Sequence, residues 1–146
     1  MLLLIFRLGD QDCALHLESV ERVLRAVKIT PLADAPRNVP GVINLHGRIV
    51  PVLDLRLQLG LPAKASELSD QFIIAQVEGR TIALLVDAVR GVAECPAERE
   101  TQAEAILPGL ESLEGIACLE GGMVIIEDLD RLCTRALGHL EDPRLG

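Results

Sequence analysis

An internal repeat is the feature of this sequence that most constrains its fold. The 15 residues from Gly41 to Leu55 return 74 positions later as Gly115 to Leu129, and six of the 15 pairs are identical. Ordinary residue usage would give about one match by chance. A second segment, Cys13 to Val23, returns 69 positions later as Ile82 to Val92. The chain is therefore expected to contain one small structural unit twice, which creates a cleft and two outer faces and suits binding better than catalysis.

Length and composition limit the number of domains and the kinds of partner that this chain can bind. A chain of 146 residues is one domain or two very small ones. Hydrophobic residues make up 49% of it, and Phe6 and Phe72 are the only aromatics, so the core must be aliphatic. The net charge of -8 argues against binding to nucleic acid and to anionic membrane surfaces, because both attract basic patches.

Features of targeting and metal binding are missing from the sequence. The first apolar run ends at Arg7, well short of the roughly 20 residues that a membrane-spanning helix needs, and it does not resemble a signal peptide. We therefore predict a cytoplasmic protein without direct membrane insertion. Cysteines 13, 95, 118 and 133 form no C-x-x-C pair, so we predict reduced thiols, no metal site and no cofactor.

Alternating and continuous apolar runs predict a chain of short strands. Two-residue turns that contain glycine, such as His46-Gly47 and Glu78-Gly79, are typical of tight hairpins. The predicted strands are Leu2–Leu8, Cys13–Leu17, Val42–Leu45, Arg48–Leu53, Phe72–Val77, Thr81–Val86, Ile116–Leu119 and Met123–Glu127. Pro51 inside one of them predicts an edge strand or a bulge.

Three segments are predicted to be helical. Val20, Val23 and Leu24 have the i, i+3, i+4 spacing of a short amphipathic helix over Glu18–Arg25. Asp54 can cap one or two turns that end at Gly60, although the alternating leucines also allow a strand. Asp128 can cap a longer helix whose apolar face runs from Leu129 to Leu140.

The remaining segments are predicted to be irregular. Prolines interrupt Ile29–Val42, and Leu61–Asp70 has the composition of a linker between the two halves. Glu94–Ser112 is expected to be a loop with one turn of helix at most. We predict a mostly β protein with two small barrels packed together. Residues 1–141 would form a single domain of two pseudo-repeated barrel subdomains, followed by a frayed tail at 142–146.

Catalytic patterns are missing from the sequence. The three histidines, His16, His46 and His139, lie far apart, and there is no nucleophile elbow and no phosphate-binding loop. We therefore predict that the chain is not an enzyme. His46 at a hairpin tip is either a tolerated turn residue or a contact residue at the seam between the barrels.

An apolar stripe has two possible roles. Val20, Val23 and Leu24 either pack in the core or line a groove for a partner helix, in which case Val86 and Val89 would line it from the second half. A small-ligand sensor that uses the cleft between the barrels is a third class of function.

Four segments resemble the CheW-like family of chemotaxis coupling proteins. The central one is Val39–Arg56, with the run Asn44-Leu-His-Gly-Arg-Ile-Val-Pro-Val-Leu-Asp54. The others are the opening from Phe6 to Leu24, the stretch Ile82–Val89 and the closing Gly115–Leu129. The resemblance implies two SH3-like five-stranded barrels side by side, with short connecting helices and a C-terminal helix. It also implies a non-enzymatic adaptor that couples the signalling tips of methyl-accepting chemoreceptors to the regulatory domain of a CheA-type histidine kinase.

The resemblance also assigns residues to the two partners. Val20, Arg22 and Gly41 fall where the family contacts the kinase. Receptor-binding positions of the family correspond to five residues: Val23, Asn44, His46, Val86 and Val89.

Two departures from the family pattern keep a second reading open. His46 takes the place of an arginine, and Arg22 stands where an acidic residue is expected. The alternative is a divergent regulator of surface motility, development or a second-messenger pathway, which binds the kinase with altered or absent receptor binding.

Overall fold

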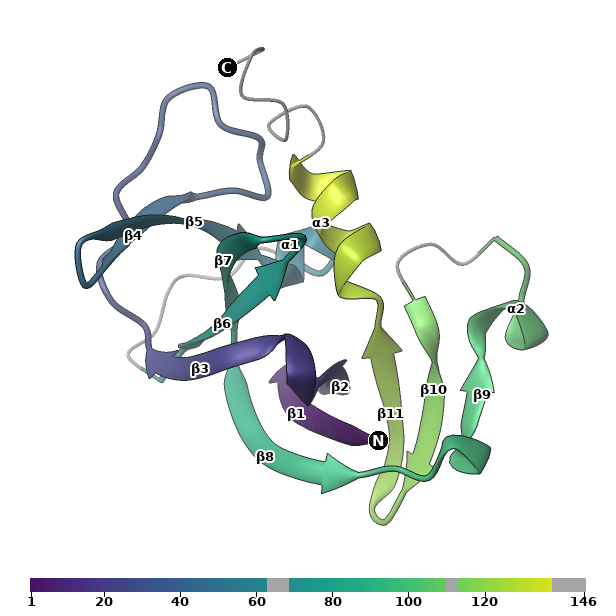
Figure 1. Ribbon diagram of the computed structural model, residues 1–146. Coiled ribbons are helices and arrows are strands. Elements are labelled where there is room, and N and C mark those ends of the chain that lie inside the picture. Colours follow the sequence, from purple (N-terminus) through teal and green to yellow (C-terminus); the bar gives the residue numbers. More distant parts are fainter. Residues whose placement is uncertain (63–68, 110–112, 138–146) are drawn as a thin grey trace.

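Two curled β-sheets make up most of the protein (Figure 1). The structure is a computed structural model, and it describes residues 1–62, 69–109 and 113–137. The predicted tail at 142–146 and the predicted domain end at 141 lie outside these residues, as does most of the predicted linker. The six-stranded sheet has the order β8-β1-β2-β11-β10-β9 and the five-stranded sheet the order β3-β6-β7-β5-β4. We call them the six-stranded and the five-stranded barrel.

The elements follow the chain in this order: β1 (Leu2–Leu8), β2 (Gln11–His16), the 3-10 turn η1 (Leu17–Ser19), β3 (Val20–Arg25), β4 (Gly41–Leu45), β5 (Arg48–Asp54), α1 (Leu55–Gln58), β6 (Gln71–Val77), β7 (Arg80–Val86), β8 (Ala88–Glu94), η2 (Ala97–Arg99), β9 (Glu100–Gln102), α2 (Ala103–Ile106), β10 (Leu113–Leu119), β11 (Gly122–Glu127) and α3 (Leu129–Leu137). All eight strands predicted from the sequence are present. The mostly β class and the two-barrel architecture are confirmed. One barrel has six strands where five were expected, because the short strand β9 pairs with β10 at its edge.

The repeat occupies equivalent elements of the two barrels. The 69-residue offset superposes β1, β2 and β3 on β6, β7 and β8, and the 74-residue offset superposes β4 and β5 on β10 and β11. Each barrel, however, takes strands from both copies. The six-stranded barrel joins β1 and β2 to strands of the second half, and the five-stranded barrel joins β6 and β7 to strands of the first. A half of the sequence therefore does not correspond to a barrel.

Each barrel has its own small apolar core, and the two cores are built from the same repeat positions. The core of the five-stranded barrel contains Ile43, Leu45, Val50, Val52, Phe72, Ile74 and Ala83. Their repeat equivalents, Ala117, Leu119, Val124, Ile126, Leu3, Ile5 and Ala14, form or pack against the core of the other barrel. Sequence similarity between the copies thus reflects two equivalent interiors.

A third and larger core joins the barrels to each other. It contains Leu4, Phe6 and Leu15 from one sheet, Ile73 and Leu84 from the other, and Leu132 with its neighbours from α3. Figure 1 shows α3 between the two barrels. Asp128 begins this helix, because its Oδ1 accepts a hydrogen bond from the backbone N of Arg131 at 3.2 Å. The predicted cap is confirmed, as is the cap by Asp54, whose Oδ1 accepts from the N of Arg56 at 3.0 Å.

The predicted helix over Glu18–Arg25 is wrong. Residues 17–19 form a 3-10 turn, and Val20–Arg25 is strand β3. Val20 pairs with Ala75 and Arg22 with Ile74, so Glu21 is the extra residue of a β-bulge. One inserted residue brings positions i and i+3 to the same face of a strand, which reproduces the spacing of a helix. Val20 and Val23 therefore both pack on the core between the barrels.

Besides β3, two strands were not predicted. β8 contains the same kind of bulge, since Ile5 pairs with Gly91 and Phe6 with Val89, leaving Arg90 as the extra residue. The bulge and Gly91 interrupt the alternation that would have marked a strand. β9 is only three residues long and depends on its pairing with β10. The predicted turn of helix in this region is present as α2.

Pro51 lies in β5, which is not an edge strand. It pairs with Val42 of β4, while the ladder to β7 begins only at Val52. In an antiparallel hairpin with a two-residue turn, facing residues alternate between hydrogen-bonded and non-hydrogen-bonded pairs, counted from the turn. The pair of Pro51 with Val42 is a non-hydrogen-bonded one, so β4 does not need an N–H from residue 51. The backbone N of Pro51 points to the other side of β5, where β7 begins to pair only at Val52. At Pro51, β5 is therefore a strand edge, although most of the strand is paired on both sides.

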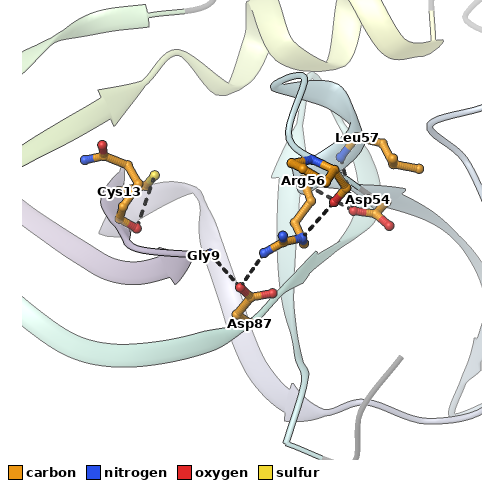
Figure 2. Close-up of polar contacts among 8 residues, drawn as sticks. Gly9, Cys13, Asp54, Arg56, Leu57 and Asp87 are labelled. Carbon is orange, nitrogen blue, oxygen red and sulfur yellow. Dashed lines mark hydrogen bonds and ion pairs between the residues drawn. The ribbon is translucent and has the colours of Figure 1, made fainter. Parts of the chain in front are cut away.

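A polar junction fixes the point where the chain crosses between the barrels (Figure 2). Asp87 lies between β7 and β8, which belong to different sheets. Its Oδ2 accepts hydrogen bonds from the backbone N of Gly9 at 2.6 Å and from Nη1 of Arg56 at 2.7 Å. Gly9 is in the turn after β1, and Arg56 is in α1 after β5. One carboxylate therefore ties together the turn of one barrel and the helix that leaves the other.

The exchange of strands predicts that neither half of the chain folds alone. Fragments 1–64 and 65–146 should each lack a cooperative thermal transition, because each holds only part of both barrels. Mixed in equal amounts, they should recover the far-ultraviolet spectrum and transition of the intact chain. Since we infer that residues 1–141 form one unit, a cooperative transition in an isolated fragment would contradict this expectation.

Glu127 predicts a second measurable property. It is 5% exposed, and burial raises its pKa from 4.5 to about 7. From pH 4.5 to about 7 the folded chain keeps this proton while the unfolded chain loses it, so stability should fall as the pH rises through that window, by on the order of 3 kcal/mol in total. Chemical denaturation of Glu127→Gln should show a smaller slope, with the remainder coming from Glu100, whose pKa is also raised to about 7. The exposed control Glu120→Gln should retain the full slope. A slope unchanged in Glu127→Gln would place the titration elsewhere.

Candidate partner-binding surface

The β4–β5 hairpin presents two of the predicted receptor-binding residues at its tip. His46 and Gly47 form the turn with φ of 51° and 88°, the left-handed pair that a tight type I′ hairpin requires. The N of Gly47 donates a hydrogen bond to Oδ1 of Asn44 at 2.7 Å. Asn44 therefore fixes the turn, while both Asn44 and His46 remain exposed to solvent.

Side chains of β3 reach this hairpin across the opening of the five-stranded barrel. Nη1 of Arg22 lies 3.5 Å from Nε2 of His46. Oε2 of Glu21 accepts from Nη2 of Arg48 at 3.0 Å. We call Glu21, Arg22, Asn44, His46 and Arg48 the tip cluster. It joins Arg22, which was assigned to the kinase, to His46, which was assigned to the receptor.

The predicted valines gather on the core between the barrels. Val20, Val23 and Val89 are half-buried and pack against it, while Val86 is 1% exposed and belongs to it. The N of Val89 donates to Oε1 of Gln71 at 2.7 Å, which fixes the start of β8 beside β6. The structure thus brings the four valines to one region. Val86 is buried in the core there and cannot itself contact a partner.

Gly41 is buried at the start of β4. A Cβ at this position would lie 2.1 Å from the carbonyl O of Thr30, which forms a bridge with Val42. The repeat equivalent Gly115 is equally restricted, since its Cβ would lie 2.5 Å from the O of Thr101 in β9. Glycine at both positions allows a neighbouring segment to approach the backbone.

Other surface residues were missed by the sequence analysis. Ile49 follows Arg48 in β5 and is 68% exposed, which is unusual for a large apolar side chain. Its repeat equivalent Met123 is 66% exposed. The repeat could have predicted both, because alternating inward and outward side chains place each of them on the outer face of its hairpin strand.

The groups whose pKa is shifted belong to other parts of the structure than the tip cluster. Nε2 of His16 lies 2.8 Å from Oε1 of Glu114, and burial, followed by a hydrogen bond and charge repulsion from Glu114, raises the pKa of Glu100 to about 7. Burial, followed by the charges of Glu127 and Asp12, raises the pKa of Cys13 to about 12, so this thiol is protonated at neutral pH and is a poor nucleophile. His139 lies outside the described residues.

No group of three or more His, Cys, Asp or Glu side chains in residues 1–62, 69–109 and 113–137 could hold a metal ion. No helix in the same ranges combines the length and the apolar character needed to cross a membrane.

Comparisons with known proteins agree with the fold. The family described as CheW-like domain matches residues 2–137. The chain is 33% identical to the chemotaxis protein CheW of Rhizobium meliloti over 134 residues, covering 88% of this chain and 84% of that protein. It is 29% identical to the chemotaxis protein CheW of Klebsiella aerogenes over 133 residues, covering 90% and 80%. The crystal structure of the scaffolding protein TtCheW from Thermoanaerobacter tengcongensis superposes with a TM-score of 0.81, at 29% identity and over 90% of each chain. The chain therefore belongs to the CheW-like domain family.

Proposed function

We propose that this protein is a cytoplasmic, non-catalytic adaptor that couples chemoreceptor tips to the regulatory domain of a CheA-type histidine kinase. The relatives reported above carry the name of a chemotaxis protein, and the similar solved structure is described as a scaffolding protein. An adaptor needs two surfaces at a fixed distance and orientation. The shared core and the Arg56–Asp87 ion pair at 2.7 Å provide this rigidity.

The observation that carries the proposal is the contact between Arg22 and His46. The family pattern expects a guanidinium at position 46, and this chain has histidine there. Arg22 places its guanidinium 3.5 Å from the His46 ring, so the hairpin tip still carries a fixed positive charge. This supports receptor binding over the alternative regulator that has lost it.

The same contact supports a coupling between the two partners. Arg22 lies in β3 and His46 in the turn of the β4–β5 hairpin. In this proposal Arg22 contacts the kinase and His46 contacts the receptor. A partner that moves one of these side chains changes the surface offered to the other. Coupling between binding sites is typically on the order of 1–3 kcal/mol, which is enough to pass receptor state to the kinase.

Single substitutions should separate the two surfaces. His46→Ala should weaken binding to a receptor signalling fragment by about tenfold and leave kinase binding unchanged, because one polar contact is lost at one surface. Arg22→Ala should weaken both. Isothermal titration calorimetry with the receptor fragment and with the kinase regulatory domain measures both affinities, and Glu120→Ala at the other hairpin tip is the matched control.

His46→Arg distinguishes the proposal from the alternative. Since Arg22 already supplies a cation, receptor affinity should change by no more than about threefold, as is usual for an exposed charge. Receptor binding that is absent in the natural chain and created by His46→Arg would favour the divergent regulator.

Gly41 and Gly115 give a matched pair for the kinase surface. Alanine at either position collides with a backbone carbonyl, at 2.1 Å or 2.5 Å, and should cost about 2 kcal/mol of stability. If the β4 region contacts the kinase, Gly41→Ala should also lower kinase affinity in folded protein, and Gly115→Ala should not. Equal affinities of the two variants would remove Gly41 from the kinase surface.

A further inference from the structure

The two barrels differ at one end. We call this end the mouth; it lies between the bulged strand (β3 or β8) and the hairpin tip (β4–β5 or β10–β11). In the five-stranded barrel, Arg48 closes the mouth. Its Nη2 donates to Oε2 of Glu21 at 3.0 Å, and its Nη1 donates to Oγ1 of Thr81 at 3.3 Å. Nε2 of Gln76 donates to the same Oγ1 at 2.7 Å and to Oε1 of Glu21 at 3.2 Å.

The mouth of the six-stranded barrel is open. A cavity of about 750 Å³ lies there, between the middle of β8 and the tip of the β10–β11 hairpin. Ile5, Leu119 and Val124 contribute apolar lining, and Val92 beside them is 55% exposed. The cavity is within the size range of ligand sites in proteins.

The repeat explains why this mouth is open. Gly122 stands at the position of Arg48, and a glycine cannot close it. The other three members of the closing network are also replaced: Asp12 stands for Thr81, Arg90 for Glu21 and Arg7 for Gln76. The cavity therefore lies where the guanidinium of Arg48 lies in the other barrel.

Asp12 gives the cavity its chemical preference. It lines the cavity, and its Oδ1 is buried without a hydrogen-bond donor among the described residues. A buried carboxylate oxygen without a donor is costly, whereas an exposed arginine is well solvated. Arg90 is exposed. Nε of Arg7, the residue opposite Asp12 in β1, is also buried without a partner among the described residues, but Arg7 does not line the cavity. The unsatisfied group that lines the cavity is therefore the carboxylate of Asp12. Glu94 and Glu120 add negative charge to the lining, while Arg90 and Arg99 add positive charge, so three carboxylates face two guanidinium groups.

The geometry points to a binding site for an arginine side chain that an extended segment of a partner protein presents to the mouth of the six-stranded barrel. The guanidinium donates to Oδ1 of Asp12, in the role that Arg48 has toward Thr81. The aliphatic stem lies on Ile5 and Val124, since arginine buries its stem while its head stays paired. β8 is the last strand of its sheet, so its outer edge can pair with the backbone of such a segment. This inference concerns a different surface from the tip cluster and does not depend on the proposed function.

Substitution of Arg90 distinguishes a basic ligand from an acidic one. It carries the same charge as the ligand and stands where the other barrel has Glu21. Arg90→Glu therefore restores the acidic partner found in the closed mouth and should strengthen binding of an arginine peptide. For an acidic ligand the same substitution should weaken binding.

The experiment uses a peptide of the chain's own hairpin, residues 45–50, with arginine, citrulline or glutamate at position 48. Titrations into the isotope-labelled full chain are followed by the amide NMR signals of Val92, Gly121 and Gly122. The arginine peptide should shift these signals. Citrulline, which is neutral and of the same shape, should bind about tenfold more weakly.

Variants of the protein complete the test. Asp12→Asn should weaken the arginine peptide by about tenfold, and Asp10→Asn, an exposed carboxylate in the adjoining turn, should have no effect. Arg90→Glu, a surface change that does not depend on the stability of Asp12→Asn, should tighten it. Signals at the mouth that do not respond to the arginine peptide at millimolar concentration, or a stronger response to the glutamate peptide, would overturn the inference.

Discussion

The apolar core between the barrels is the constraint on which the rest of the structure depends. Phe6 and Leu15 from one sheet meet Ile73 and Leu84 from the other, and α3 covers the junction. Because each sheet contains strands of both repeats, this core can form only when the whole chain has folded. The polar junction at Asp87 then fixes the crossing between β7 and β8. A rigid pair of barrels follows, and with it a fixed distance between any two partner-binding surfaces.

The two copies of the repeat keep what a barrel needs and differ where a surface or a special environment is formed. Their interiors match position by position, and both contain a bulge at the same place in β3 and β8. They differ at Leu53 and Glu127, one apolar and one a buried carboxyl with a raised pKa. They differ again at Arg48 and Gly122, which close one mouth and leave the other open. Divergence between the copies is therefore a guide to function in this chain.

Packing and register account for the errors of the sequence analysis. Short strands with glycine turns, the capped helices and the two-barrel class could be read from patterns within the chain. The i, i+3 spacing of Val20 and Val23 could not be interpreted correctly, because a bulge and a helix give the same spacing and only the pairing with β6 separates them. β8 was missed for the same reason. Among the site residues, Asn44 and His46 lie at the expected tip, whereas Val86 proves to be buried and Gly41 to make room for Thr30. Their binding roles remain predictions.

The sequence by itself determined which residues are apolar, where the turns and caps lie and that one unit occurs twice, because these properties are local or repeat along the chain. Tertiary structure alone decided which copy supplies which strand, since an antiparallel hairpin can pair with either half without any change in its own pattern. It also decided that Arg22 meets His46 at 3.5 Å and that Asp12 faces an open cavity. Contacts between side chains far apart in sequence depend on the register of strands, and that register is set by how well the shared core packs.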